Sequence, residues 1–253
     1  MAVSSSSCPG VHVAINSVAS YAAPRAHLLA ALRAAGVPAQ QVHVFLGGAQ
    51  GDEAAYVEAE SGVLHYRVRH NSVDFTAMVH IVENPERFRG VAQWFYLHDT
   101  VSVGAGFWSN ATRWCGGLPA CALPLTRWMP SSSMGLYDAS FLNAHAADVV
   151  ALKNVRNATA MRWKQRGMGW EDKLFKVCDA TSRDGPIRRF TRRCQNTTLR
   201  RPTCICSLAQ LDETLVRVYG AHSTPRQALR FPCADVVKFK ANWARNRTLV
   251  IAP

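Results

Sequence analysis

Residues 11–46 have the sequence VHVAINSVASYAAPRAHLLAALRAAGVPAQQVHVFL, and this stretch decides the fold class. Val11–Ile15 and Val42–Leu46 are short apolar runs with β-branched residues, which favours buried strands. Between them, Ala26–Ala35 consists mainly of strong helix formers, with Pro24 in the first turn and a glycine directly after the run. A strand, a helix and a strand in such close succession form a βαβ unit, whose strands are parallel and whose crossover is right-handed. The sequence therefore predicts an α/β fold.

The rest of the chain is organised around Trp94–Phe107, WFYLHDTVSVGAGF. The aromatic run that opens this stretch favours a buried strand, and Asp99 follows at its end. A carboxylate there has to be hydrogen-bonded, paired or bound to a cation, and α/β sheets commonly hold ligands at strand ends. An equally favoured alternative is that Asp99 caps the following turn. Along a straight strand, His98 and Thr100 point to one side and Asp99 to the other, so all three face one ion only if the chain turns.

The remaining patterns predict further strands and helices. Val63–Val68 is a predicted strand, and Val73–Val82 is a predicted helix, capped by Asn71-Ser72 and ended before Asn84-Pro85 by the pre-proline restriction. Ala105–Pro130, rich in Gly, Trp and Pro, is predicted to be a long irregular segment, as in binding loops. Further strands are predicted at Ser132–Tyr137, Thr214–Tyr219 and Val236–Trp243, the last as an edge strand or extended arm, and further helices at Ala139–Lys153, Arg156–Arg166 and Lys173–Cys178.

The composition limits the classes of function. With 253 residues and 48% hydrophobic content, the chain can bury a substantial core. Its formal net charge of +12 predicts attraction to polyanions or to phosphate-bearing small molecules. Arginines crowd into residues 183–201, but no interleaved aromatic residues offer a base-stacking platform, so a solvated basic face is favoured over a nucleic-acid site.

The sequence features favour different cellular compartments. No window reaches the ~18 apolar residues of a membrane-spanning helix, so no transmembrane segment is expected. Met1–Gly10 lacks the basic start and apolar core of a secretion signal, which favours the cytoplasm. Eight cysteines and four N-x-[ST] sequons favour the Golgi or ER lumen instead. The spacing of Cys178, Cys194, Cys204 and Cys206 matches no zinc signature, so free or disulfide-bonded cysteines are favoured over a zinc site. The sequons lie at Asn110, Asn157, Asn196 and Asn246.

The order of elements, with an acidic strand end in mid-chain and Glu171-Asp172 further on, resembles the GT-A fold of nucleotide-sugar glycosyltransferases. The phrases INSVASY, FLGG, FYLHDT, MGLYD, GWEDKLF and VVKFKANW are similar to a divergent branch related to the family 2 transferases. The resemblance implies a single Rossmann-like domain over residues 8–253, with a mixed, mostly parallel sheet flanked by helices. The nucleotide-binding half would be about 8–104 and the acceptor-side half about 105–253.

The resemblance also implies residues that hold the donor. Asn16, Ser17 and Tyr21 match the first strand end, which cradles the base and ribose of the nucleotide. Asn71 and Asp74 match a second nucleotide-contacting segment.

The resemblance implies a divalent metal, Mn²⁺ or Mg²⁺, on the sugar diphosphate. His98-Asp99-Thr100 aligns with the acidic DxD motif that holds it, but here only one carboxylate remains. His222 falls near a further metal ligand of some members, and imidazole suits manganese. A histidine that is merely exposed in a loop is the favoured alternative for His222.

The chemistry of transfer explains these residue types. Negative charge builds on the departing phosphate, and a cation or basic side chains stabilise it; the basic candidates are Lys173, Arg183, Arg188 and Arg189. The acceptor hydroxyl has to lose its proton, so an inverting enzyme needs a nearby carboxylate. Asp172 matches that base, with Glu171 on acceptor hydroxyls, although the pair equally suits the start of a helix. Trp170 and Trp163 suit a sugar platform or the core.

Three hypotheses follow. The first is a glycosyltransferase that moves a sugar from a nucleotide-sugar donor to a hydroxyl of a glycan, protein or small molecule. The second is a binding protein of the same fold that has lost turnover, as the single carboxylate of the HDT motif suggests. The third, a basic nucleic-acid-binding module, predicts salt-dependent polyanion binding that is insensitive to Asp99→Ala.

Overall fold

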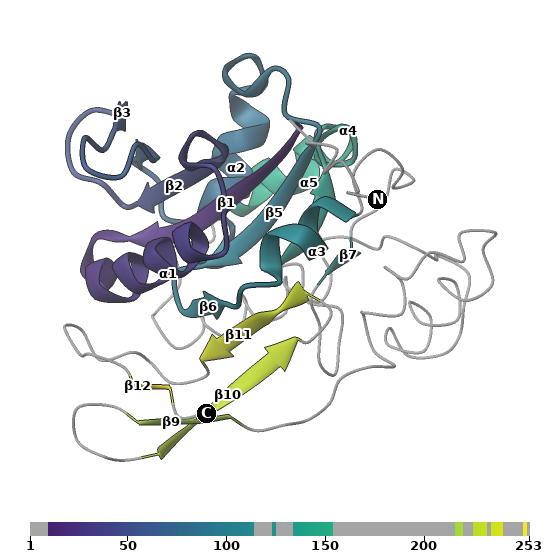
Figure 1. The fold of residues 1–253 in the computed structure, drawn as a ribbon. Helices are drawn as coiled ribbons and strands as arrows, with labels where there is room; N and C mark the ends of the chain where they lie inside the picture. Colours follow the sequence, from purple (N-terminus) through teal and green to yellow (C-terminus); the bar gives the residue numbers. More distant parts are fainter. Residues whose placement is uncertain are drawn as a thin grey trace, which may run out of the picture.

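The computed structural model describes residues 10–113, 123–124, 134–153, 216–219, 225–231, 234–239 and 250–251 (Figure 1). They form two sheets. The larger sheet has seven strands in the order β3-β4-β2-β1-β5-β8-β7. The strands of this sheet are β1 Val11–Val18, β2 Val42–Gly47, β3 Ala54–Val57, β4 Leu64–Val68, β5 Gln93–His98, β7 Leu123–Pro124 and β8 Gly135–Asp138. Strands β4, β2, β1 and β5 are mutually parallel, whereas β3 and β8 run antiparallel to their neighbours, so the sheet is mixed.

The predicted βαβ unit is confirmed. The chain leaves β1 through the short helix η1 (Ala19–Tyr21), continues into α1 (Ala22–Ala34) and returns to β2 through η2 (Ala39–Gln41), which precedes β2 directly. Gly36, with φ +78°, adopts the left-handed conformation that ends helices. Strand β1 pairs with β2 in parallel, and the fold class is α/β as predicted.

Helices cover both faces of the larger sheet (Figure 1). Alternate residues of β5 divide between two cores, with Phe95 and Leu97 on the α1 side and Trp94 and Tyr96 on the α2 side. Every residue of β5 is buried, because the strand is covered on both faces, and this explains its unbroken apolar run. The α2 side contains η3 Val73–Phe75, α2 Thr76–Glu83, η4 Pro85–Phe88, α4 Ala139–Ala144 and α5 Ala146–Val150.

The chain turns at Asp99 and Thr100 and enters the second sheet at β6 (Val101–Val103). This sheet has five strands in the order β12-β9-β10-β11-β6, paired antiparallel throughout. The other four strands are β9 Val216–Tyr219, β10 Pro225–Phe231, β11 Val236–Phe239 and β12 Val250–Ile251. No helix among the described residues is long and apolar enough to cross a membrane.

Several predicted elements differ from the structure. Strand β11 lies between β10 and β6, so the prediction of an edge strand or arm is wrong. The segment predicted as irregular contains α3 (Phe107–Arg113), whose Phe107 ring packs 4.8 Å from Phe95, centroid to centroid. This burial favours a helix despite the surrounding glycines.

Local capping differs as well. Ser72 makes no side-chain cap; instead Thr76 Oγ1 accepts a bond from the Ser72 amide at 2.9 Å. The helix predicted at 139–153 is broken at His145 into α4 and α5, and Asp138 caps α4. The predicted helices at 156–166 and 173–178 lie outside the described residues. Strands β3, β7, β10 and β12 had no predicted counterpart.

Candidate functional site

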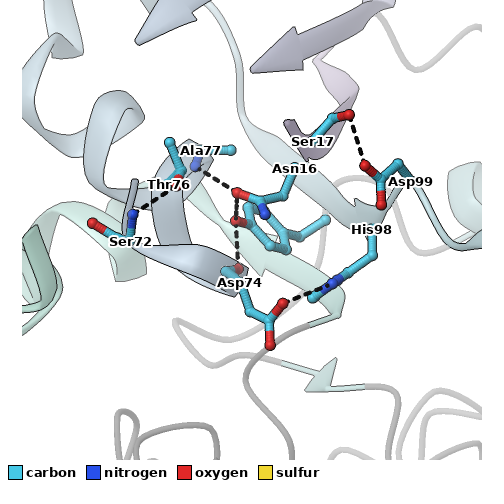
Figure 2. A network of polar contacts seen from close by, with 9 residues as sticks. Asn16, Ser17, Ser72, Asp74, Thr76, Ala77, His98 and Asp99 are labelled. Carbon is cyan, nitrogen blue, oxygen red and sulfur yellow. Dashed lines mark hydrogen bonds and ion pairs between the residues drawn. The ribbon is translucent and has the colours of Figure 1, made fainter. Parts of the chain in front are cut away.

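The candidate site lies at the carboxyl ends of β1 and β5, which are neighbours in the sheet. Asn16 of β1 and His98 of β5 occupy the same register position, so Ser17 and Asp99 follow side by side. This edge of a parallel sheet is where α/β proteins commonly bind ligands. The structure therefore brings together Asn16, Ser17, His98 and Asp99, four of the residues that the resemblance assigns to the donor (Figure 2).

Asp99 is a buried carboxylate at the turn between β5 and β6, with 7% of its surface exposed. Its Oδ2 accepts a 2.7 Å hydrogen bond from Ser17 Oγ, and its amide donates to the Asn16 carbonyl at 3.2 Å. Burial raises the pKa of Asp99 to about 6, against the opposing effects of the Ser17 bond and the charges of His98 and Arg25. Among the described residues, Ser17 is the donor to this carboxylate, so the alternative of a turn cap is not seen.

Arg25 adds a positive charge to this edge. Its Nη1 donates to Ser17 Oγ at 3.1 Å and to the Val18 carbonyl at 3.3 Å. The residue lies in the first turn of α1, where the positive end of the helix disfavours a cation. Arg25 was not predicted for the site, although its unfavourable position in the first turn is a signal that another interaction holds it there.

Asp74 and His98 form an ion pair when the histidine is charged. Asp74 Oδ1 lies 3.2 Å from His98 Nδ1; the histidine is buried and a third of the aspartate side chain is exposed (Figure 2). Asp74 lies in η3, so this contact joins the segment around Asn71 and Asp74 to the end of β5. If Nδ1 carries the proton shared with Asp74, Nε2 is the acceptor nitrogen of the neutral ring.

Asn16 fixes the position of α2 relative to β1. Its Oδ1 accepts from the Ala77 amide at 3.0 Å and from the Tyr96 hydroxyl at 3.1 Å. The same hydroxyl lies 2.9 Å from the Asp74 carbonyl, so its proton is shared between two acceptors. Burial is the largest cause that raises the pKa of Tyr96 well above its usual range. Tyr96 and Ala77 were not predicted for the site, because their contacts arise only when the strands and α2 pack together.

Tyr21 and Asn71, the other two predicted nucleotide-binding residues outside this cluster, follow the ends of β1 and β4. Tyr21 is half-buried in η1, directly before α1. Asn71 is half-buried beside Gly48, where a Cβ would lie 3.4 Å from Asn71 Nδ2. Gly48 has φ +73°, so a side chain there is strained as well as close to Asn71.

Other candidate residues lie outside the described residues: Trp163, Trp170, Glu171 and Asp172 for the acceptor, His222 for the metal, and the basic candidates Lys173, Arg183, Arg188 and Arg189. Within the described residues, no group of three or more His, Cys, Asp or Glu side chains is arranged to hold a metal ion. Magnesium ions in proteins are commonly held by only one or two carboxylates together with substrate phosphates and water. The metal therefore remains a prediction that rests on Asp99.

Comparison of the chain with protein-family models, curated proteins and solved structures returned no significant match.

Proposed function

We propose that the protein is a glycosyltransferase that moves a sugar from a nucleoside-diphosphate sugar to a hydroxyl acceptor. The observation that carries the proposal is the cluster of Ser17, Asp99, Asp74 and His98 at the carboxyl edge of β1 and β5. A buried carboxylate at this edge, beside a guanidinium, suits a ligand that brings both phosphate charge and sugar hydroxyls.

The nucleotide is proposed to lie against Asn16, Ser17, Tyr21, Asn71 and Asp74, with His98 alongside. Asn16 acts mainly as a positioning residue, because its side-chain oxygen already accepts from Ala77 and Tyr96. A third of the Asp74 side chain is exposed, which suits a direct hydrogen bond to a ribose hydroxyl.

Charge on the departing diphosphate has to be stabilised in place. Asp99 is the candidate ligand for a divalent cation, Mn²⁺ or Mg²⁺, which when bound would neutralise phosphate charge. The proton of the acceptor hydroxyl is proposed to pass to Asp172, with Glu171 and Trp170 contacting the acceptor, in an inverting reaction. These three assignments rest on the sequence resemblance.

A second candidate is a nucleotide-sugar-binding protein without turnover. The observation that favours it is that His98-Asp99-Thr100 has one carboxylate in place of an acidic pair, and that burial raises the pKa of this carboxylate to about 6. The two candidates share a donor site and differ in whether an acceptor is converted.

The first experiment is a thermal-shift panel with UDP, GDP, ADP and dTDP, each with and without Mn²⁺. A ligand that binds only the folded state raises its melting temperature by mass action. We expect one nucleotide to stabilise the wild type with Mn²⁺, and Asp99→Asn to lose that response. Asp52→Asn is the matched control, because Asp52 is almost fully exposed in its pair with Arg69.

Turnover is then tested with the donor sugar of the stabilising nucleotide and a panel of hydroxyl acceptors. Release of nucleoside diphosphate together with a glycosylated product supports the transferase. Stabilisation without product supports the binding protein. If no nucleotide stabilises the chain but heparin does, the donor site is refuted and the basic module takes its place.

A further inference from the structure

The guanidinium of Arg25 is held at the candidate site on one side. Both of its hydrogen bonds among the described residues come from Nη1, to Ser17 Oγ and the Val18 carbonyl. A guanidinium has five N–H donors, and the edge formed by Nε and Nη2 presents two parallel ones. Within the part of the chain that the structure describes, no acceptor occupies that edge.

The charge of Arg25 is also unbalanced at short range. Among the described residues, no carboxylate oxygen lies within ion-pair distance of Arg25, although Asp99 is one hydrogen bond away through Ser17. A half-buried cation at the start of a helix, without a paired carboxylate, is electrostatically unfavourable. An anionic ligand at the Nε and Nη2 side of Arg25 would supply both the missing hydrogen-bond acceptor and the missing negative charge.

We infer that Arg25 binds a phosphate group of the donor through Nε and Nη2, a contact that rests on the proposed function. Parallel N–H groups match two phosphate oxygens, and such bidentate pairs are among the strongest charge-assisted hydrogen bonds. Ser17 accepts from Arg25 and donates to Asp99, so it fixes the guanidinium and the carboxylate relative to each other.

This contact gives the single carboxylate of the HDT motif a partner. Asp99 Oδ2 and Arg25 Nη1 both bond the same Ser17 Oγ, at 2.7 and 3.1 Å, so a phosphate bound by Arg25 would lie near the carboxylate that would hold a cation. Positive charge that is fixed in place stabilises the departing diphosphate without reorganisation during the reaction.

The test measures binding of inorganic pyrophosphate and of the nucleoside diphosphates by calorimetry. Arg25→Lys keeps the charge but loses the planar fork, and Arg25→Gln loses both. We expect Arg25→Lys to weaken pyrophosphate binding about tenfold and Arg25→Gln about a hundredfold, from the usual strength of charged hydrogen bonds. Arg33→Gln is the matched control, because Arg33 is exposed near the end of the same helix and should change affinity less than about twofold.

A role confined to folding predicts a different result. If Arg25 only anchors the connection from β1 to α1, Arg25→Lys lowers the melting temperature of the free protein and leaves pyrophosphate affinity unchanged. That result overturns the inference while the glycosyltransferase proposal stands. If the wild type binds pyrophosphate through Arg25 but no nucleoside diphosphate, the anion contact is supported and the nucleotide-sugar donor is refuted. If it binds neither, both proposals fall.

Discussion

Ser17 Oγ donates a 2.7 Å hydrogen bond to Asp99 Oδ2, and this bond joins the ends of two neighbouring parallel strands. The Ser17 hydroxyl is neutral, so this hydrogen bond lowers the pKa of Asp99 but does not neutralise the negative charge of the carboxylate. Burial outweighs it and raises that pKa to about 6. The carboxylate is therefore ionised at neutral pH, and this ionisation lowers the free energy of unfolding.

Ser17→Ala should destabilise the fold by about 1–3 kcal/mol at pH 8, because a buried carboxylate loses its donor. The loss should be smaller at pH 5, where Asp99 is protonated in the folded state. Urea denaturation at both pH values measures the difference. Ser61→Ala is the control, because Ser61 bonds the partly exposed Glu58 and should have little effect at either pH. An equal loss at both pH values would contradict the role of Asp99.

His80→Leu should stabilise the protein by about 1 kcal/mol at pH 7. His80 is 3% exposed, and neither ring nitrogen has a hydrogen-bond partner among the described residues. Its ring lies against Phe45, Tyr66 and Phe88, so an apolar side chain of similar size suits the position. Chemical denaturation measures the gain. His145→Leu, at a position that is more than a third exposed, should change stability by less than about 0.5 kcal/mol.

Stability should fall on acidification below about pH 6.5. Burial lowers the pKa of His43 to about 3 and that of His80 to about 4, so both rings stay neutral in the folded state. The unfolded chain takes up protons below about 6.5, and folding stability is lost progressively as the pH falls towards the folded values. Near pH 4.5 the loss should be on the order of 2–3 kcal/mol for each histidine.

Asp99 acts in the opposite sense in part of this range. Its raised pKa gives stability that is present below about pH 4 and lost as the pH rises through 6. Equilibrium unfolding between pH 4 and 8 tests the sum, and His80→Leu should flatten the acid limb. A wild-type profile without an acid limb would refute the buried neutral histidines.

Gly104→Ala should destabilise the contact between β6 and β11. A Cβ at Gly104 would overlap the side-chain carboxylate of Asp235. The two residues are held close because the Gly104 amide donates a 2.9 Å hydrogen bond to the backbone carbonyl of Asp235. We expect a loss of about 1–3 kcal/mol from the overpacking. Asp235→Gly removes the carboxylate and suits the φ of +51° at that position, so the double variant should lose less than the sum of the single losses. Additive losses would exclude the clash.

Local patterns were sufficient for strands β1, β2 and β5 and for one edge of the site. The apolar runs of β1, β2 and β5 are contiguous in sequence, and parallel pairing then places Asn16 beside His98 and Ser17 beside Asp99. The contact between Arg25 and Ser17 depends on how α1 docks. Spacing along the chain does not encode that docking.

Composition was misleading where tertiary contacts decide the structure. Phe107 lies in a glycine-rich segment but packs on Phe95, and α3 forms there. The alternation of β11 suggested one solvent-facing edge, yet the strand pairs on both sides, with β10 and β6. Which strands flank another depends on residues more than a hundred positions away.

The turn at Asp99 and Thr100 is a two-residue joint between the sheets, since β5 ends at His98 and β6 begins at Val101. A ligand bound to Asp99 would therefore restrict the backbone of this turn. Part of the free energy of ligand binding would then restrain movement of one sheet relative to the other. The expected signature is slower hydrogen exchange at the amides of β6 and β11. These amides would be protected at a distance, through stiffening of the joint rather than through contact with the ligand.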